Sequence, residues 1–144
     1  MKHLSMAIAG TALCGALAWL PQGAAAADKA DKVDKDETQA IDADKPGTKT
    51  VRGKIRGYDT VEYKVAVRQG QALAVKLKTS SRSNYFNITP PGAQEASFIG
   101  SIKGLEYRGK VDQDGEYTVS VYLMRNAARR NESAAYTLTV ATQQ

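Results

Sequence analysis

The segment VEYKVAVRQGQALAVKLK (residues 61–78) decides the fold class, because large apolar residues occupy alternate positions in both of its halves. A period of two is typical of strands that bury one face. The connector Arg68-Gln69-Gly70-Gln71 predicts a hairpin loop in which Gly70 takes a positive φ. The apolar positions are Val61, Tyr63, Val65 and Val67 in the first half, and Leu73, Val75 and Leu77 in the second.

The same alternation returns in YTVSVYLM (117–124) and YTLTV (136–140). Shorter apolar runs predict weaker strands near 51–55, 85–88, 98–99 and 106–110. Glycine- or proline-bearing turns separate these runs, and no helical period spans residues 51–144. The pattern predicts an all-β fold, an antiparallel β-sandwich of about seven or eight strands within one domain over 51–144.

The first 50 residues have a different composition. A short positive start, an apolar run over 4–20 and Ala24 to Ala27 are typical of a secretory signal peptide, so we expect cleavage after residue 27. Residue 13, before Cys14, is a leucine, which argues against lipidation. We therefore expect a periplasmic protein without a membrane anchor after cleavage. Residues 28–50 hold four Asp-Lys pairs and no aromatic residue, which predicts a charged, flexible tether.

The residue types that are missing restrict the function more than any motif does. The only histidine, His3, and the only cysteine, Cys14, both lie in the signal peptide. The mature chain therefore has no disulfide, and it lacks the commonest metal ligand and the commonest general base. DQDG (112–115) resembles the start of a calcium loop but lacks the rest of it, so a turn explains it better. We expect no metal, no cofactor and no enzymatic activity.

The excess of positive charge lies in the predicted sandwich. Residues 51–144 carry fourteen Lys/Arg and eight Asp/Glu, whereas 28–50 carry five and seven. A basic domain fits an anionic partner. An exported protein rarely meets nucleic acid, so we expect no nucleic-acid partner. A basic face that contacts only solvent remains the alternative.

The stretch YLMRNAARRNESAAY (122–136) connects two predicted strands without any glycine. If 126–130 form one helical turn, Arg125 and Arg129 are four positions apart and their guanidinium groups project the same way. Two such donor groups suit carboxylates or phosphates. Tyr122 and Met124 alternate with inward residues and are expected to face outward beside them, as an interface aromatic would. A loop of solvated charges is the alternative.

Four segments together resemble the periplasmic inhibitors of goose-type (g-type) lysozyme. They are GKIRGYDTVEYKVAVRQGQALAVKL (53–77), YFNITPPG (85–92), DGEYTVSVYLMRNAAR (114–129) and YTLTV (136–140). The Arg-Asn-x-Ala-Arg element is the most specific of the shared features. The resemblance implies a β-sandwich that blocks the lysozyme's substrate cleft with a loop. It also implies that Tyr58, Arg125 and Arg129 contact the enzyme, and we add their neighbour Tyr122 to this partner-binding set.

Together with the predicted signal peptide, the resemblance implies an exported inhibitor whose protein partner is a g-type lysozyme. A lysozyme cleft keeps a general-acid carboxyl group partly desolvated, and an inserted arginine would pair with it while it displaces the sugar. The alternative is a non-catalytic glycan- or peptide-binding module of the cell envelope, because the hairpin and DGEYTVSV also resemble sandwich modules appended to secreted peptidases.

Overall fold

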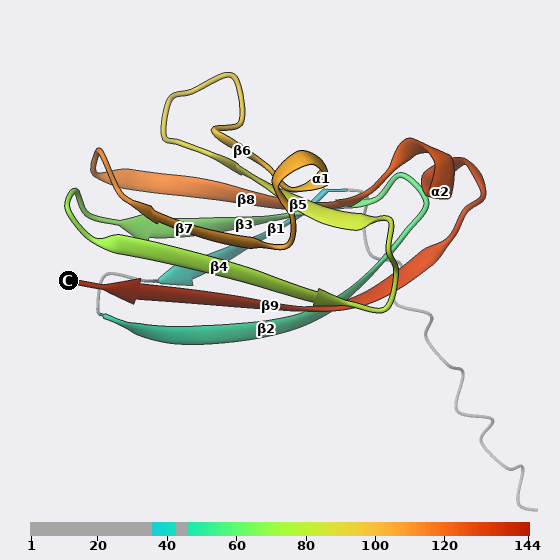
Figure 1. Ribbon diagram of the computed structural model, residues 1–144, viewed down its shortest axis with the longest axis horizontal. Helices are drawn as coiled ribbons and strands as arrows, with labels where there is room; N and C mark the ends of the chain where they lie inside the picture. Colours follow the sequence, from blue (N-terminus) through green and yellow to red (C-terminus); the bar gives the residue numbers. More distant parts are fainter. Residues whose placement is uncertain (1–35, 43–45) are drawn as a thin grey trace, which may run out of the picture. The chain divides into compact units, whose positions relative to one another are not determined.

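The alternating segments form the two sheets of an all-β sandwich, as predicted (Figure 1). The computed structural model describes residues 36–42 and 46–144. Sheet A has the order β1 (Asp36–Asp42), β3 (Thr60–Val67), β8 (Gly115–Leu123), β5 (Asn84–Thr89) and β6 (Phe98–Ile99). Sheet B has the order β2 (Gly47–Arg56), β9 (Ser133–Gln143), β4 (Ala72–Thr79) and β7 (Glu106–Lys110). Two short helices, α1 (Gly100–Lys103) and α2 (Arg125–Arg129), complete the described part.

The core lies between the two sheets and contains the inward positions that the alternation predicted. All of them are buried on β3, β4, β8 and β9. Across the core, the hydroxyl groups of Tyr63 and Tyr136 are 2.7 Å apart, which joins sheet A to sheet B by a buried hydrogen bond. Phe86 stacks on Phe98, and Phe98 meets the edge of Tyr107, both at centroid distances of 5.2 Å. Burial of these apolar side chains is the main contribution to stability.

The predicted hairpin at 68–71 is wrong. β3 pairs with β1 and β8, whereas β4 pairs with β7 and β9, so the connector crosses from one sheet to the other. Gly70 does take a positive φ of 90°. The buried Gln71 side chain accepts a hydrogen bond from the Arg68 backbone N–H, and the Gln71 carbonyl accepts one from the Val111 N–H. Alternation identifies a half-buried strand but not the strand beside it, and two consecutive strands can belong to opposite layers.

The predicted flexible tether is also wrong for 36–42 and 47–50, which are strand. β1 pairs in parallel with β3, and Ile41 on β1 is buried in the core. The buried Ile41 and the backbone pairing with β3, which runs along the whole of β1, hold this edge segment on sheet A. β1 raises the number of strands above the seven or eight expected. Residues 28–35 and 43–45 lie outside the described residues, as does the predicted signal peptide over 1–27.

Within residues 36–42 and 46–144, no helix is long and apolar enough to cross a membrane. No group of three potential metal-binding side chains occurs in them either. In DQDG, Gln113 and Asp114 form a bend before β8, and the Asp114 carboxylate accepts a hydrogen bond from the Gln69 backbone N–H at 2.6 Å. Asp114 therefore joins this bend to the connector between β3 and β4.

Candidate functional site

The helical turn α2 connects β8 to β9, one residue earlier than predicted. Ala127 and Ala128 face the interior and are buried, which leaves Arg125 and Arg129 on the exposed side. Small side chains at the two inner positions let the backbone of the turn lie against the sandwich. Arg125 and Arg129 therefore lie on a short helical turn whose inner side packs against the sandwich.

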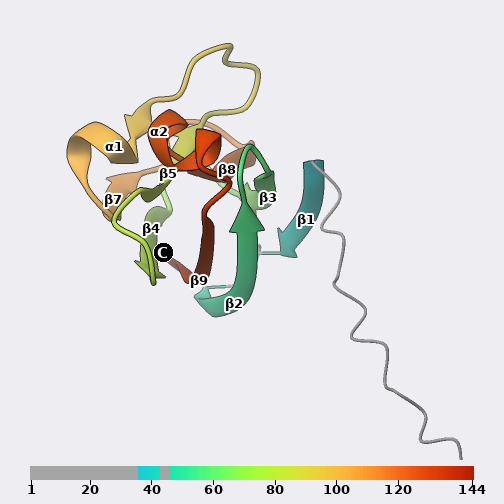
Figure 2. The same ribbon diagram turned by 90° about the vertical axis from the view of Figure 1, so that its right-hand side faces the viewer.

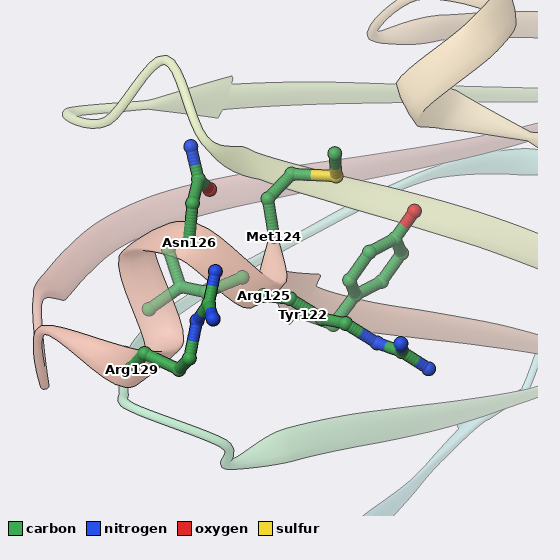
Figure 3. Close-up of a pocket in the computed structure, with 6 residues that line it drawn as sticks. Tyr122, Met124, Arg125, Asn126 and Arg129 are labelled. Carbon is green, nitrogen blue, oxygen red and sulfur yellow. The ribbon is translucent and has the colours of Figure 1, made fainter.

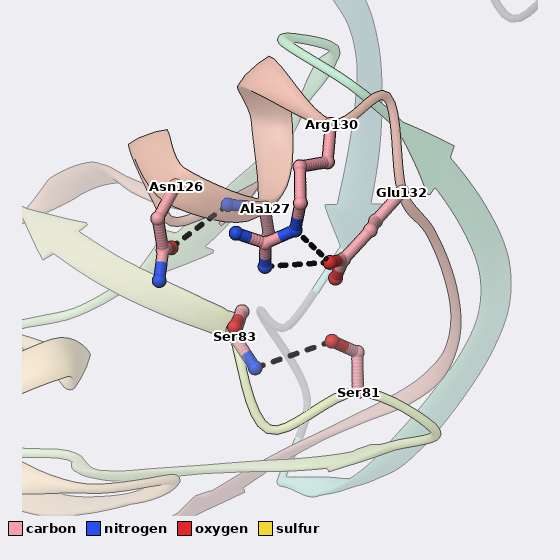
Figure 4. Close-up of polar contacts among 6 residues, drawn as sticks. All are labelled: Ser81, Ser83, Asn126, Ala127, Arg130 and Glu132. Atoms are coloured by element: carbon pink, nitrogen blue, oxygen red, sulfur yellow. Dashed lines mark hydrogen bonds and ion pairs between the residues drawn. The ribbon is translucent and has the colours of Figure 1, made fainter.

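Hydrogen bonds hold both ends of α2 (Figure 4). At its start, the Met124 backbone N–H donates to the Ser83 carbonyl at 2.8 Å, and the Asn126 side chain accepts from the Ala127 N–H at 2.8 Å. After its end, Asn131 adopts a positive φ of 55°, a conformation that asparagine tolerates better than most residues. The N–H groups of Asn131 and Glu132 then donate back to the turn. The connector without glycine thus closes through an asparagine.

Tyr122, Arg125 and Arg129 line one hollow of about 540 Å³ together with Leu123, Met124 and Asn126. Figure 3 shows the guanidinium groups of Arg125 and Arg129 pointing in different directions, although both border this hollow. The Tyr122 hydroxyl donates to the Asn87 side-chain oxygen at 3.2 Å, so this half-buried ring is held by the sheet. The hollow therefore combines one fixed aromatic ring with two exposed cations.

Tyr58 lies in the turn between β2 and β3, next to α2. The turn is tied to the end of α2 because the Gly57 N–H donates to the Glu132 carbonyl at 2.9 Å. Gly57 has φ 61°, and a Cβ there would lie 2.9 Å from the Asn131 side-chain oxygen, so this position needs glycine. Tyr58 itself is 64% exposed.

A second hollow, of about 520 Å³, joins the Tyr58 turn to α2. It is lined by residues 56–59 together with Ala128, Arg129 and Asn131. Arg129 borders this hollow and the first one as well. The structure thus brings Tyr58, Tyr122, Arg125 and Arg129 to one end of the sandwich, which we call the arginine end. Figure 2 looks onto this end, where α2 lies beside the turn between β2 and β3.

The arginines at this end differ in their pairing. Arg130 donates to the Glu132 carboxylate through Nε at 2.7 Å and Nη2 at 2.6 Å (Figure 4). For Arg125 and Arg129, no carboxylate of the described residues is within ion-pair distance. A guanidinium group without an internal partner can donate two parallel hydrogen bonds to an external carboxylate or phosphate. The arrangement is thus suited to binding an anionic group.

Sequence reasoning missed the residues that position the site. The buried Asn84 side chain donates to the Tyr122 carbonyl at 2.9 Å, and Asn87 holds the Tyr122 hydroxyl. Ser83 anchors the start of α2. These residues reach the arginine end only because β5 pairs with β8, so no local sequence pattern indicates their role.

Comparison with known proteins identifies the family. No protein-family model and no curated protein sequence matches the chain. Among solved structures, PliG of Aeromonas hydrophila, a periplasmic lysozyme inhibitor of g-type lysozyme, superposes with a TM-score of 0.63 at 32% sequence identity. The match covers 75% of this chain and 99% of that one. The chain belongs to the PliG family.

A second PliG, from Salmonella Typhimurium, matches with a TM-score of 0.58 at 22% identity, over 74% of this chain and 98% of that one. The pre-peptidase C-terminal domain of a collagenase from Bacillus anthracis has a TM-score of 0.58 at 19% identity, over 73% and 95%. These two structures share the sandwich fold with this chain. The 32% identity to the Aeromonas PliG is what distinguishes this chain as a PliG from other β-sandwiches.

Proposed function

We propose that this protein is an exported, periplasmic inhibitor of g-type lysozyme, and that its arginine end occupies the enzyme's substrate cleft. The observation that carries the proposal is the 32% identity to a PliG over nearly the whole of that chain. The geometry of the arginine end supports the choice of surface. Tyr58, Arg125 and Arg129 come together there, and neither arginine has an ion-pair partner among the described carboxylates.

The inhibition needs no chemistry from the inhibitor. A lysozyme cleft holds a carboxyl group in a partly desolvated site, where it acts as a general acid. Arg125 or Arg129 donates hydrogen bonds to such a carboxyl group and stabilises its charged form, which removes the proton that catalysis requires. Tyr58 and Tyr122 provide aromatic surface beside the arginines, where sugar would otherwise bind. The absence of histidine and cysteine after residue 27 agrees with a non-catalytic role.

A second candidate is a glycan- or peptide-binding module of the cell envelope. The fold shared with the collagenase's pre-peptidase C-terminal domain favours it. The two candidates differ in one measurement, because only an inhibitor slows peptidoglycan lysis at concentrations close to that of the enzyme. Turbidity assays with g-type, c-type and i-type lysozymes should show inhibition of the g-type enzyme. Equal lysis in all three assays, with retained binding to peptidoglycan, would select the module instead.

Replacing either arginine tests the proposed surface. Truncating one partner of a buried interfacial charge pair costs about 2–5 kcal/mol, which is roughly 30-fold to several-thousand-fold in affinity. Arg125→Ala and Arg129→Ala should therefore weaken inhibition of g-type lysozyme by such factors. Both side chains are exposed, so the free energy of unfolding should change by no more than about 0.5 kcal/mol.

The matched control is Lys76→Ala, which removes an exposed cation on β4 in sheet B. It should leave both inhibition and thermal unfolding near the parent values. The arginine end would be the wrong surface if both arginine variants inhibited as well as the parent. Unfolding of the arginine variants in the same buffer would show that the arginines are structural.

A further inference from the structure

The outer face of sheet B carries most of the domain's excess positive charge. Residues paired across an antiparallel sheet share a face, so the pairing places alternate residues of β2, β9, β4 and β7 on this outer side. The cations on it are Arg52, Lys54 and Arg56 of β2, Lys76 and Lys78 of β4, and Arg108 and Lys110 of β7.

Few carboxylates balance this charge. Glu106 is the only acidic residue at the outward positions of the four strands, and it pairs with Lys76 at the β7 edge. The hydrogen bond from Lys76 is the main cause that lowers the pKa of Glu106 below its usual value, and the positive charge of Lys76 lowers it further. Within the described ranges none of the other six cations has an ion pair. On the outer face of sheet A, by contrast, Lys64 pairs with Glu62 at 3.4 Å.

The middle strand of the face forms a floor between the cations. β9 lies between β2 and β4 (Figure 1), and its outward positions are small: Ala135, Thr137, Thr139 and Ala141. Thr137 pairs with Arg52 on one side and with Lys78 on the other. With strands about 4.8 Å apart, the two rows of cations stand roughly 10 Å apart across this floor. Within one row, cations two residues apart are about 6.7 Å from each other.

We infer that this face binds a linear polyanion, which lies along β9 between the cations of β2 and β4. A narrow floor of small residues admits a single extended chain, and cations on both sides contact its anionic groups. None of the exposed large hydrophobic residues of the described chain, which are Tyr58, Ile99, Ile102 and Met124, belongs to these four strands, so the contact is electrostatic. The inference does not depend on lysozyme inhibition, because Arg125 and Arg129 are not part of the face.

Long-chain inorganic polyphosphate is a suitable probe, with orthophosphate as the monomeric control. The affinity of the full chain for polyphosphate should fall steeply between about 50 and 200 mM salt, because binding releases counterions. Orthophosphate at the same phosphate concentration should bind far more weakly. The test variant R52Q/K54Q/K78Q removes cations on both sides of β9. It should bind polyphosphate about 100-fold more weakly at low salt, if each surface contact contributes as a charge pair in water does.

The slope of log K against log salt gives an independent readout. With a coefficient of about 0.7 per contact, as for single strands, three lost contacts should flatten the slope by about 2. R125A/R129A, which removes two cations outside this face, is the control, and it should keep the affinity for polyphosphate within about threefold while it loses lysozyme inhibition. R52Q/K54Q/K78Q should retain inhibition and an unchanged melting temperature.

Three results would overturn the inference. One is unchanged polyphosphate binding by a folded R52Q/K54Q/K78Q variant. Another is an equal loss of binding in R125A/R129A, which would show that only net charge matters. The third is binding to phosphatidylglycerol vesicles but not to polyphosphate, which would indicate a membrane surface. Failure of lysozyme inhibition in the parent protein would leave this test unaffected.

Discussion

The space between the two sheets and the arginine end are built from opposite kinds of residue. Between the sheets, apolar side chains from strands far apart in the sequence fill the interior, and the hydroxyl groups of Tyr63 and Tyr136 pair with each other there. At the arginine end, Arg125 and Arg129 are exposed and unpaired within the described chain, on a turn of only five residues. The interior supplies stability and no binding surface, whereas the arginine end adds little burial and carries the groups that can bind.

The largest effect should come from Phe86→Ala, which removes a fully buried ring that stacks on Phe98. Phe→Ala in a core typically costs about 3–5 kcal/mol, from lost transfer free energy and the cavity left behind. Chemical denaturation should show this loss, while inhibition of g-type lysozyme at a temperature where the variant is folded stays at the parent level. A loss of inhibition in the folded variant would contradict the separation of the two regions.

Ile41→Ala tests whether β1 belongs to the interior. Ile41 is 4% exposed, and Ile→Ala in a core costs about 2–5 kcal/mol, so we expect the lower end of this range at an edge strand. The readout is the midpoint of urea unfolding, and Thr38→Ala on the exposed side of β1 is the control. A change no larger than that of the control would restore the flexible tether that the sequence predicted.

Of the three core changes, Ala127→Leu, at the place where the two regions meet, should have the smallest effect on stability. Ala127 is fully buried on the inner side of α2, and added methylene groups in a packed site cost about 1–3 kcal/mol. In this variant stability and lysozyme inhibition should both decrease, because the larger side chain displaces the turn that carries Arg125 and Arg129. Thermal unfolding and lysozyme inhibition, measured on the same preparation, check this. Stability loss with full inhibition would mean that the position of the turn is unimportant.

The alternating sequence predicted much of the fold from local information. The strands over 61–67, 72–78, 117–124 and 136–140 appear with their predicted inward faces, and the weaker strands appear as well. The failures have a common cause. The local sequence predicts a hairpin at 68–71 because it does not show which strand pairs with which. It predicts a tether over 36–42 because the parallel partner of β1 lies 24 residues away in the sequence.

The sequence by itself determined the all-β class, the buried faces, the absence of histidine and cysteine after residue 27, and the arginine-bearing turn. Each of these follows from side-chain identity and the period of the chain. Only the tertiary structure decided that Tyr58 lies beside Arg129, that Asn84 and Asn87 hold Tyr122, and that cations of β2 and β4 flank β9. These are contacts between segments far apart in the chain. They depend on how the sheets pair and close, because backbone hydrogen bonds and the shared core fix strand neighbours that no local stretch encodes.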